Sequence, residues 1–259
     1  MSIGGTSQWP ATLFRGIDQW GERFGYILVD PIGGAIGAFS TGDGINTGGQ
    51  SRTPICKLPN VEHTEQSFPV LYLYRKEVLD SGGAGKWRGG LSAESCFIPH
   101  RTGQITHDTL SSGNATPTSP GMMGGYPGSV NVYKFLRATD VKERFAGSDI
   151  PADIAELHGR EEVLQLRQGD FLQNPADAYA VIWSAAGGFG DPFERDPERV
   201  REDVAEGRAV SREAAREIYG VVVREDGSLD REGTTRERAG RRAAKVRKDA
   251  RTLGGEAIA

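Results

Sequence analysis

The sequence predicts an α+β protein: a β-rich mixed domain with glycine-rich loops, followed by a C-terminal helical hairpin and a basic helical tail. Short apolar runs separated by turn residues fill residues 1–194. Glycine and proline total 36 and 13 residues with no repeat period, which indicates many turns around β-strands. Helical patterning begins only near Asp196. We expect the β-rich domain over 1–194, the hairpin over 195–222 and the tail over 223–259.

The expected strands are short runs rich in β-branched and aromatic residues and bounded by turn residues. They cover residues 24–29, 67–79, 91–98, 130–135, 162–166 and 179–183. The run 33–39 is apolar but too rich in glycine for a stable helix, and it suits close approach to another backbone or to a ligand. Residues 110–128 predict one long irregular loop, of a kind that is usually functional or at an interface.

Capping residues predict the two helices of the hairpin. Asp196 is a good N-cap, Pro197 suits the first helical position, and Gly207 ends the first helix. The second helix begins after Ser211 and ends at Gly220. Residues 231–251 then hold nine arginines or lysines against three acidic residues. We expect this basic tail to be poorly ordered unless it docks on a partner.

Overall charge and cysteine content exclude several classes of protein. The net charge of −4 gives no support for a nucleic-acid or anionic-membrane partner. No apolar run reaches the roughly 18 residues that a membrane-spanning helix needs, and the N-terminus does not resemble a signal peptide. We therefore expect a cytoplasmic protein. Cys56 and Cys96 lie far apart, which favours reduced, buried thiols over a disulfide framework or a zinc knuckle.

One short segment combines groups that could perform acid–base chemistry. Asn60, Glu62, His63 and Glu65 fall within six residues, just before a predicted strand. In an extended strand, Glu62 and His63 would point to opposite faces, and Asn60 and Glu62 would share one face. The alternative is a polar strand edge or a subunit contact. The chain's four histidines show no metal-binding spacing, so we expect no metal site made by this chain alone.

Four segments together resemble the hydantoinase B/oxoprolinase family. Residues 80–91, DSGGAGKWRGGL, resemble its D-S-G-G signature, and residues 60–69 resemble the segment that leads into it. Residues 187–197, GGFGDPFERDP, and the glycine-rich loop 120–128 resemble two further motifs of the family. Family subunits are considerably longer, and the resemblance implies that this chain corresponds to their C-terminal half. The histidines and acids that bind metal in the family's ketone carboxylases would lie in the other half.

The resemblance implies membership of an ATP-dependent heteromeric enzyme. Its expected partners are a hydantoinase A-like ATP-binding subunit, the N-terminal half of the hydantoinase B-like subunit, and a small-molecule substrate. ATP and a divalent metal are expected on the partner subunits, and this chain is expected to be inactive alone. The reaction it favours is carboxylation of a ketone with bicarbonate, because the lead-in 72–75 is closer to that branch. The alternatives are ATP-dependent hydrolysis of a cyclic amide (hydantoin, lactam or 5-oxoproline) and a non-catalytic structural subunit.

The same resemblance suggests which residues face the reaction. Glu62, His63 and Glu65 are the candidate catalytic residues. Backbone amides in glycine loops can approach an anion closely, so we also expect some loop residues to line a substrate or phosphate site. These residues are Asn60, Gly82, Gly83, Gly85, Arg88, Gly124 and Gly125.

Overall fold

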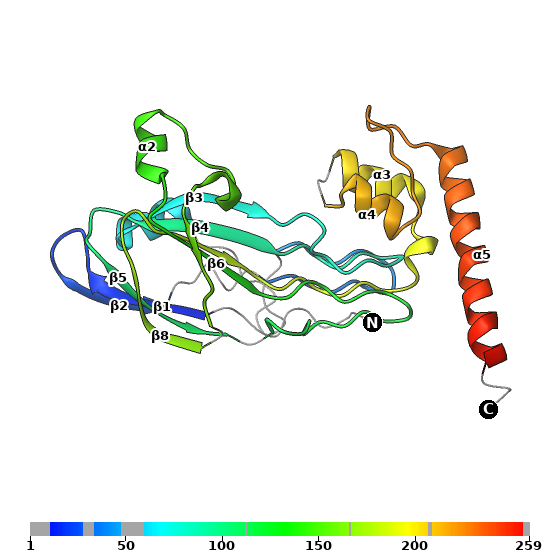
Figure 1. The fold of residues 1–259 in the computed structure, drawn as a ribbon, viewed down its shortest axis with the longest axis horizontal. Helices are drawn as coiled ribbons and strands as arrows, with labels where there is room; N and C mark the ends of the chain where they lie inside the picture. Colours follow the sequence, from blue (N-terminus) through cyan, green and yellow to red (C-terminus); the bar gives the residue numbers. More distant parts are fainter. Residues whose placement is uncertain are drawn as a thin grey trace.

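The computed structural model describes residues 11–27, 34–47, 60–111, 113–165, 167–206 and 209–255. Within these ranges the strands form two antiparallel sheets (Figure 1). The four-stranded sheet has the order β2 (Arg23–Ile27), β1 (Ala11–Ile17), β5 (Ile105–Leu110), β8 (Arg167–Gln173). The five-stranded sheet has the order β3 (Val70–Glu77), β4 (Ala93–Pro99), β9 (Ala178–Ile182), β6 (Val132–Arg137), β7 (Arg160–Glu162).

Aromatic side chains from both sheets form the core between them. Alternate residues of a strand share a face, which brings Phe14 of β1 and Phe171 of β8 onto the inner face of one sheet. Phe97 and Tyr179 face them from the other sheet. The rings of Phe171 and Tyr179 meet edge to face with centroids 5.8 Å apart. Such contacts stabilise the two-layer packing beyond simple burial of area.

Helices cover the outer face and one end of the five-stranded sheet. The helix α2 (Val141–Ala146) and the 3-10 helix η2 (Ile154–Glu156) pack against the outer face, around Leu73, Cys96 and Ile98. At the far end lie η3 (Pro192–Glu194), α3 (Pro197–Ala205), α4 (Arg212–Glu217) and α5 (Arg231–Gly255). None of the helices in the described ranges is long and apolar enough to span a membrane.

Four extended segments lie between the sheets and these helices. They comprise residues 34–47, 81–92, 119–129 and 184–190, and we call them the glycine layer. Their backbones hydrogen-bond directly to one another: Trp87 and Phe189 exchange two bonds of 3.0 and 2.9 Å, and the N–H of Tyr126 donates to the carbonyl of Ala84 at 2.7 Å. Figure 1 shows segments of this layer running side by side towards α3 and α4.

Close backbone contact explains why glycine recurs in this layer. A Cβ atom on Gly89 would lie 1.9 Å from the carbonyl oxygen of Ala186, and one on Gly83 would lie 2.3 Å from the carbonyl oxygen of Tyr126. Both distances are shorter than any nonbonded contact, and both neighbours are backbone atoms that cannot rotate away. Residues 33–39 are predicted from sequence to approach another backbone closely; in the described part, the N–H of Ala38 donates to the carbonyl of Gly187 at 3.0 Å.

The prediction that residues 67–79 form one strand was partly wrong. The strand β3 spans only Val70–Glu77, and the preceding residues form the helix α1 (Val61–Ser67). Asn60 caps this helix, because its side chain accepts a hydrogen bond from the N–H of His63, and Glu62 lies in the first turn. The expectation that Glu62 and His63 point to opposite faces of a strand is therefore wrong.

Other predicted boundaries shifted, and three strands were missed. The strand expected at 162–166 shares only residue 162 with β7 (Arg160–Glu162), and residues 163–165 are not in a strand. The second helix after Ser211 ends at Glu217. The strands β1, β5 and β8 were not predicted, and they carry polar or charged residues on their outer face. Of the predicted strand 24–29, residues 28 and 29 lie outside the described residues, as do Gly33, Cys56 and Gly207. Cys96 is a buried free thiol, as expected.

His107 is a core residue held in its neutral form. Its ring is fully buried, stacks on Phe171 with centroids 5.0 Å apart, and lies 2.8 Å through Nε2 from Oε1 of Gln173. Because Nε2 of Gln173 donates to the carbonyls of Phe97 and Asp177, its Oε1 is an acceptor and His107 carries its proton on Nε2. Burial lowers the pKa of His107 to about 4.

We predict that Gly89→Ala destabilises the protein far more than Gly103→Ala. The methyl group at position 89 would collide with the carbonyl of Ala186, and relieving the collision should cost about 3 kcal/mol. A Cβ atom on Gly103 would meet nothing within 4 Å, so alanine there should be neutral or slightly stabilising. Urea unfolding of both variants checks the difference. Equal stabilities would show that the glycine layer can open without cost.

We predict that His107 makes the free energy of unfolding depend on pH between pH 6.5 and pH 4. The folded pKa of about 4 lies below the ordinary 6.5, so the unfolded chain binds the extra proton. The neutral His107 therefore contributes about 3 kcal/mol to the free energy of unfolding above pH 6.5, and this contribution is lost as the pH falls towards 4. Unfolding measured against pH for wild type and His107→Phe should give a shallower slope for the variant. Parallel slopes would contradict a neutral core histidine.

Candidate functional site

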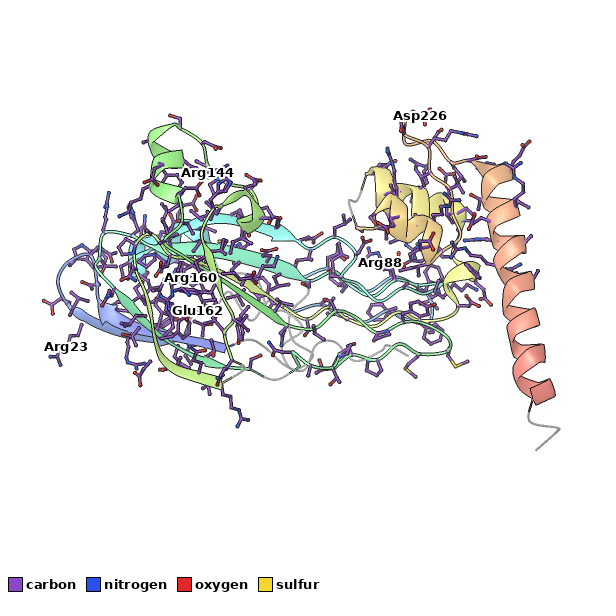
Figure 2. The ribbon with its side chains drawn as sticks, in the orientation of Figure 1. Arg23, Arg88, Arg144, Arg160, Glu162 and Asp226 are labelled. Carbon is purple, nitrogen blue, oxygen red and sulfur yellow. The ribbon has the colours of Figure 1, made fainter. Side chains whose placement is uncertain are left out.

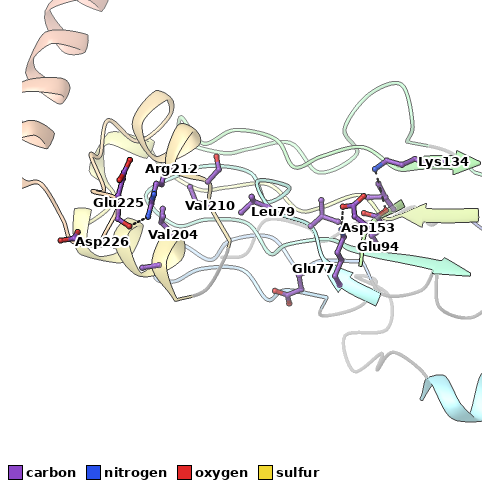
Figure 3. A pocket seen from close by; sticks show the side chains of 16 residues that line it. Glu77, Leu79, Glu94, Lys134, Asp153, Val204, Val210, Arg212, Glu225 and Asp226 are labelled. Carbon is purple, nitrogen blue, oxygen red and sulfur yellow. Dashed lines mark hydrogen bonds and ion pairs between the residues drawn. The ribbon is translucent and has the colours of Figure 1, made fainter. Parts of the chain in front are cut away.

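A groove of about 1300 Å³ lies between the five-stranded sheet and the helices α3 and α4. Figure 3 shows Glu94, Lys134 and Asp153 at its sheet end, and Arg212, Glu225 and Asp226 at its helical end. Leu79, which follows β3 into the glycine layer, lies between the two ends. The groove therefore depends on the glycine layer to hold the sheet and the helices apart.

Glu94 is the buried acid at the sheet end of the groove. It lies in β4, a strand whose residues are all buried, and its side chain is 4% exposed. The hydroxyl of Tyr74 donates to its Oε1 at 2.7 Å and accepts the N–H of Ile154 at 2.9 Å. Nζ of Lys134 lies 3.9 Å from the same carboxylate oxygen. A buried carboxylate needs such partners, because burial without them is costly.

A second ion pair borders this cluster. Nζ of Lys76 donates to the carboxylate of Asp153 and lies 4.8 Å from the centroid of the Tyr74 ring. Burial would raise the pKa of Asp153, but the hydrogen bond and charge of Lys76 lower it overall. Burial raises the pKa of the Tyr74 hydroxyl and of the Cys96 thiol, so both stay protonated at neutral pH. Neither group is activated as a nucleophile or base by its surroundings.

The groove carries an excess of negative charge. Its lining includes three basic residues, Lys76, Lys134 and Arg212. Five acids line it as well: Glu77, Glu94, Asp153, Glu225 and Asp226. Such a lining favours cationic or neutral hydrogen-bonding ligands over anions.

The predicted catalytic residues lie elsewhere, on α1. Glu62 and Glu65 border a smaller hollow of about 510 Å³ together with Trp20, His100 and Arg101. Oε1 of Glu65 already accepts the N–H of Tyr72 at 2.8 Å, which fastens α1 to β3.

The helix gives the other two predicted residues different positions. Asn60 caps the helix, and His63 is exposed and does not line this hollow. The structure thus brings Glu62 and Glu65 to one hollow but leaves His63 outside it. Their catalytic role stays a prediction.

Two of the glycines expected to bind phosphate, Gly83 and Gly125, donate their N–H groups inside the protein. The N–H of Gly83 donates to the carbonyl of Ala186 at 2.8 Å, and the N–H of Gly125 donates to that of Met122 at 2.9 Å. A Cβ on Gly82 or Gly85 would collide with neighbouring backbone, whereas Gly124 adopts a left-handed conformation with φ of 94°. These contacts favour a packing role, and phosphate contact stays a prediction.

Arg88 is also engaged inside the protein. It lies in the glycine layer near α3 and α4 (Figure 2), where its guanidinium donates to Asn46 and to the carbonyl of Gly89 at 3.2 and 2.7 Å. Its Nε lies 3.5 Å from the carboxylate of Asp203, and the side chain is 8% exposed. This burial leaves little of the guanidinium accessible to a ligand.

A buried arginine connects the glycine layer to α3. Arg195, 1% exposed, donates to both carboxylate oxygens of Asp43 at 2.6 and 2.8 Å and to Asp203 at 2.7 Å. Burial would raise the pKa of Asp43, but the hydrogen bonds and charge of Arg195 lower it overall. Two-pronged pairing of this kind fixes orientation as well as energy.

Among the residues that the structure describes, no group of three or more histidine, cysteine or acidic side chains is placed to hold a metal ion. Two of the four described histidines have other contacts: His107 packs in the core, and His158 pairs through Nδ1 with Asp140 at 2.9 Å. The donor set in these ranges therefore does not fit a complete metal site.

Sequence reasoning missed the groove residues Lys76, Glu94, Lys134 and Asp153. One signal was available, because Glu94 is the one charged residue in the predicted strand 91–98. A charge predicted inside a buried strand requires a partner. The partner itself was not predictable locally, since Tyr74 is 20 residues away and Ile154 is 60 residues away along the chain.

Comparison with known proteins identifies the family. The model of the hydantoinase B/oxoprolinase family matches residues 2–192. The chain belongs to the hydantoinase B/oxoprolinase family. The glycine layer and the sheets lie within the matched range, so the packing described above is that of a hydantoinase B-type protein.

Two carboxylase subunits are similar to this hydantoinase B-type chain. The acetone carboxylase alpha subunit of Xanthobacter autotrophicus is 29% identical over 253 residues, covering 90% of this chain and 31% of the relative. The acetophenone carboxylase delta subunit of Aromatoleum aromaticum is 28% identical over 221 residues, covering 82% and 32%. The chain thus spans about a third of the length of these relatives.

Other relatives carry a different activity. The caprolactamase subunit beta of Pseudomonas jessenii is 30% identical over 180 residues, covering 70% of this chain and 28% of the relative.

Among solved structures, nucleotide-free acetone carboxylase superposes with a TM-score of 0.81 at 27% identity, covering 96% of this chain and 35% of that chain. The ATP-dependent caprolactamase superposes with a TM-score of 0.72 at 23% identity, covering 92% and 38%, which supports the fold alone.

We predict that Tyr74→Phe destabilises the protein by about 1–3 kcal/mol, because it leaves the buried Glu94 carboxylate and the N–H of Ile154 without their partner. Tyr126→Phe is the matched control, since that ring is 51% exposed and the change should stay within about 0.5 kcal/mol. Thermal and urea unfolding of both variants measure the difference. An equal effect would show that the Glu94 cluster contributes nothing to stability.

Proposed function

We propose that this chain is one part of an ATP-dependent heteromeric enzyme that carboxylates a ketone with bicarbonate. The observation that carries the proposal is the similarity to the acetone carboxylase alpha subunit, which extends over 90% of this chain and is accompanied by a TM-score of 0.81. Phosphorylation by ATP makes a ketone enol and bicarbonate reactive, and the reacting groups must then be shielded from water. A single chain with open hollows supplies only part of such an enclosure.

Hydrolysis of a cyclic amide is the second candidate, supported by the 30% identity to caprolactamase subunit beta. The same ATP-dependent activation would then make a lactam carbonyl open to attack by water. A third candidate is a subunit without catalytic groups that supports its partners. The position of Glu62 and Glu65 at a hollow speaks against this third candidate.

ATP and a divalent cation, under this proposal, bind to partner polypeptides. The described residues offer no three-ligand cluster, and the relatives have two thirds of their length outside the region that matches this chain. We propose a hydantoinase A-like ATP-binding subunit and the N-terminal part of a hydantoinase B-like subunit as partners. When bound, the metal would supply charge that stabilises developing negative oxygen atoms.

Within the chain, we propose Glu62 as the acid–base group that faces substrate. It lies in the first turn of α1 and borders the 510 Å³ hollow beside Arg101, whose positive charge suits an anionic intermediate. Glu65 positions α1 through its bond to Tyr72. His63 would act only if a partner polypeptide completed the exposed side of α1.

We predict that the assembly isolated through a tag on the full chain hydrolyses ATP with acetone or acetophenone only when bicarbonate is present. Radiolabelled bicarbonate should appear in an acid-stable product, because a carboxylase forms a new carbon–carbon bond. The isolated chain, tested in parallel, should be inert.

Two other results would contradict different parts of the proposal. ATP turnover with caprolactam that ignores bicarbonate would replace carboxylation by cyclic-amide hydrolysis. Robust turnover by the isolated chain would overturn the proposal that it works only within an assembly.

A further inference from the structure

One of the four sheet edges in the described part of the chain is left open to pairing. Exposed strand edges promote unwanted pairing, and proteins normally interrupt them with bulges, charges or short length. The edge strand β3 has a register shift between Tyr72 and Tyr74, and β7 has only three residues, all charged. The edge strand β8 has a register shift where it meets β5, and its Asp170 has a φ of 56°. The edge strand β2 is less protected: its five residues carry one charge, at Arg23, and its register against β1 is continuous from Arg23 to Ile27.

The hairpin geometry fixes which backbone groups of β2 face outward. The N–H of Asp18 donates to the carbonyl of Glu22 at 2.8 Å, which makes these two residues a hydrogen-bonded pair. Bonded and non-bonded pairs alternate in antiparallel strands, so the next bonded pairs are Gly16–Phe24 and Phe14–Tyr26. The N–H groups of the intervening residues therefore point away from β1. These residues are Arg23, Gly25 and Ile27.

Side chains on the same hairpin are exposed and apolar. Trp20 at its tip is 67% exposed, and Tyr26 and Ile27 on β2 are 45% and 41% exposed. Tyr26 and Ile27 lie on opposite faces of β2, so apolar side chains flank the outer edge of the strand on both sides. Aromatic residues are enriched at interaction surfaces.

The hairpin is also held rigidly. Oδ1 of Asp18 accepts the N–H groups of Trp20 and Glu22 at 2.9 Å, and Nε2 of Gln19 donates to the carbonyl of Gln66 on α1 at 3.0 Å. A fixed edge loses little conformational freedom on pairing, which favours binding.

We propose that β2 pairs with an extended strand from the polypeptide that makes up the rest of the enzyme assembly, so that the four-stranded sheet continues into a partner. This inference rests on the proposed function, in which the chain is one part of a larger assembly. The length of the carboxylase relatives supports this partner, because two thirds of each relative lies outside the region that matches this chain. The backbone chemistry supports it too, since N–H and carbonyl groups that have no partner among the described residues are satisfied best by another strand.

The side chains of β2 predict some of the residue types in the partner strand. Arg23, Gly25 and Ile27 share the outer face of β2, opposite to Phe24 and Tyr26. The partner strand should therefore carry an acidic residue across from Arg23 and an apolar residue across from Ile27. Gly25, between them, leaves the outer face open for a large partner side chain.

The test uses Gly25→Pro and its matched control Gly25→Ala in the full chain. Proline removes the outward N–H and is tolerated on an edge strand, and a Cβ at this position meets only the Cβ of Arg15 at 3.9 Å. Both variants should fold, as circular dichroism and unfolding curves would confirm. The assembly isolated through a tag on each chain is the probe, and its composition is read by native mass spectrometry. Gly25→Pro should bind the partner polypeptide at least about 10-fold more weakly, and Gly25→Ala should match wild type.

Hydrogen exchange at single-residue resolution then locates the contact. In the wild-type assembly, the amides of Arg23, Gly25 and Ile27 should exchange at least about 100-fold more slowly than in the isolated chain. The amides of Phe24 and Tyr26 should be protected in both, because they bond to β1.

Four outcomes would overturn the inference: unchanged exchange at these three amides in the assembly, normal assembly of Gly25→Pro, protection that arises in a homodimer, or isolation of the chain alone. An assembly that turns over ATP while β2 stays unprotected would leave the proposed function standing and remove only this inference.

Discussion

The structure depends on one constraint, the direct contact of backbone with backbone in the glycine layer. Where Gly89 meets Ala186 there is no space for even a methyl group, so the separation of the segments is set by main-chain atoms alone. Main-chain contacts are stiffer than side-chain contacts because no rotamer can absorb a change. The layer therefore acts as a rigid spacer between the aromatic core and the helices α3 and α4, and the groove beside Glu94 exists because of that spacing.

A rigid spacer needs firm attachment at its helical end, and Arg195 provides it. Its guanidinium joins Asp43 of one extended segment to Asp203 of α3. The neighbouring Arg88 also contacts Asp203. Burying these charges has a large desolvation cost, which the carboxylates of Asp43 and Asp203 offset in part. Among the described residues, Nε of Arg195 and Nε of Arg88 have no hydrogen-bond partner. Removing Arg195 would take from Asp43 and Asp203 the shortest ion pair that each makes, which makes the cluster a determinant of geometry rather than a simple gain in stability.

Local sequence signals predicted some of this arrangement and missed other parts for identifiable reasons. Asp196 and Ser211 cap α3 and α4 as predicted, because capping depends on neighbouring residues alone. The helix α1 was taken for the approach to a strand, although Asn60 and Glu62 carry the same local signal. The core role of His107 could not be predicted from spacing, because its partner Gln173 is 66 residues away. Contacts of that kind depend on strand pairing, which local periodicity does not encode.

The two hollows differ in the charge of their linings, and this difference limits which ligand each can bind under the proposed function. A phosphorylated intermediate carries negative charge, and the groove beside Glu94 holds five acids against three bases. Repulsion inside a partly buried groove is stronger than in water, so an anionic intermediate is disfavoured there. The hollow beside α1 differs, because two acids, Glu62 and Glu65, border it with Arg101 and His100, so its excess of negative charge is smaller. An anionic intermediate handled by this chain is therefore better matched to the hollow beside α1, which adjoins the hairpin tip at Trp20. The groove, with its negative lining, is better matched to a basic polypeptide segment or to a neutral, hydrogen-bonding ligand.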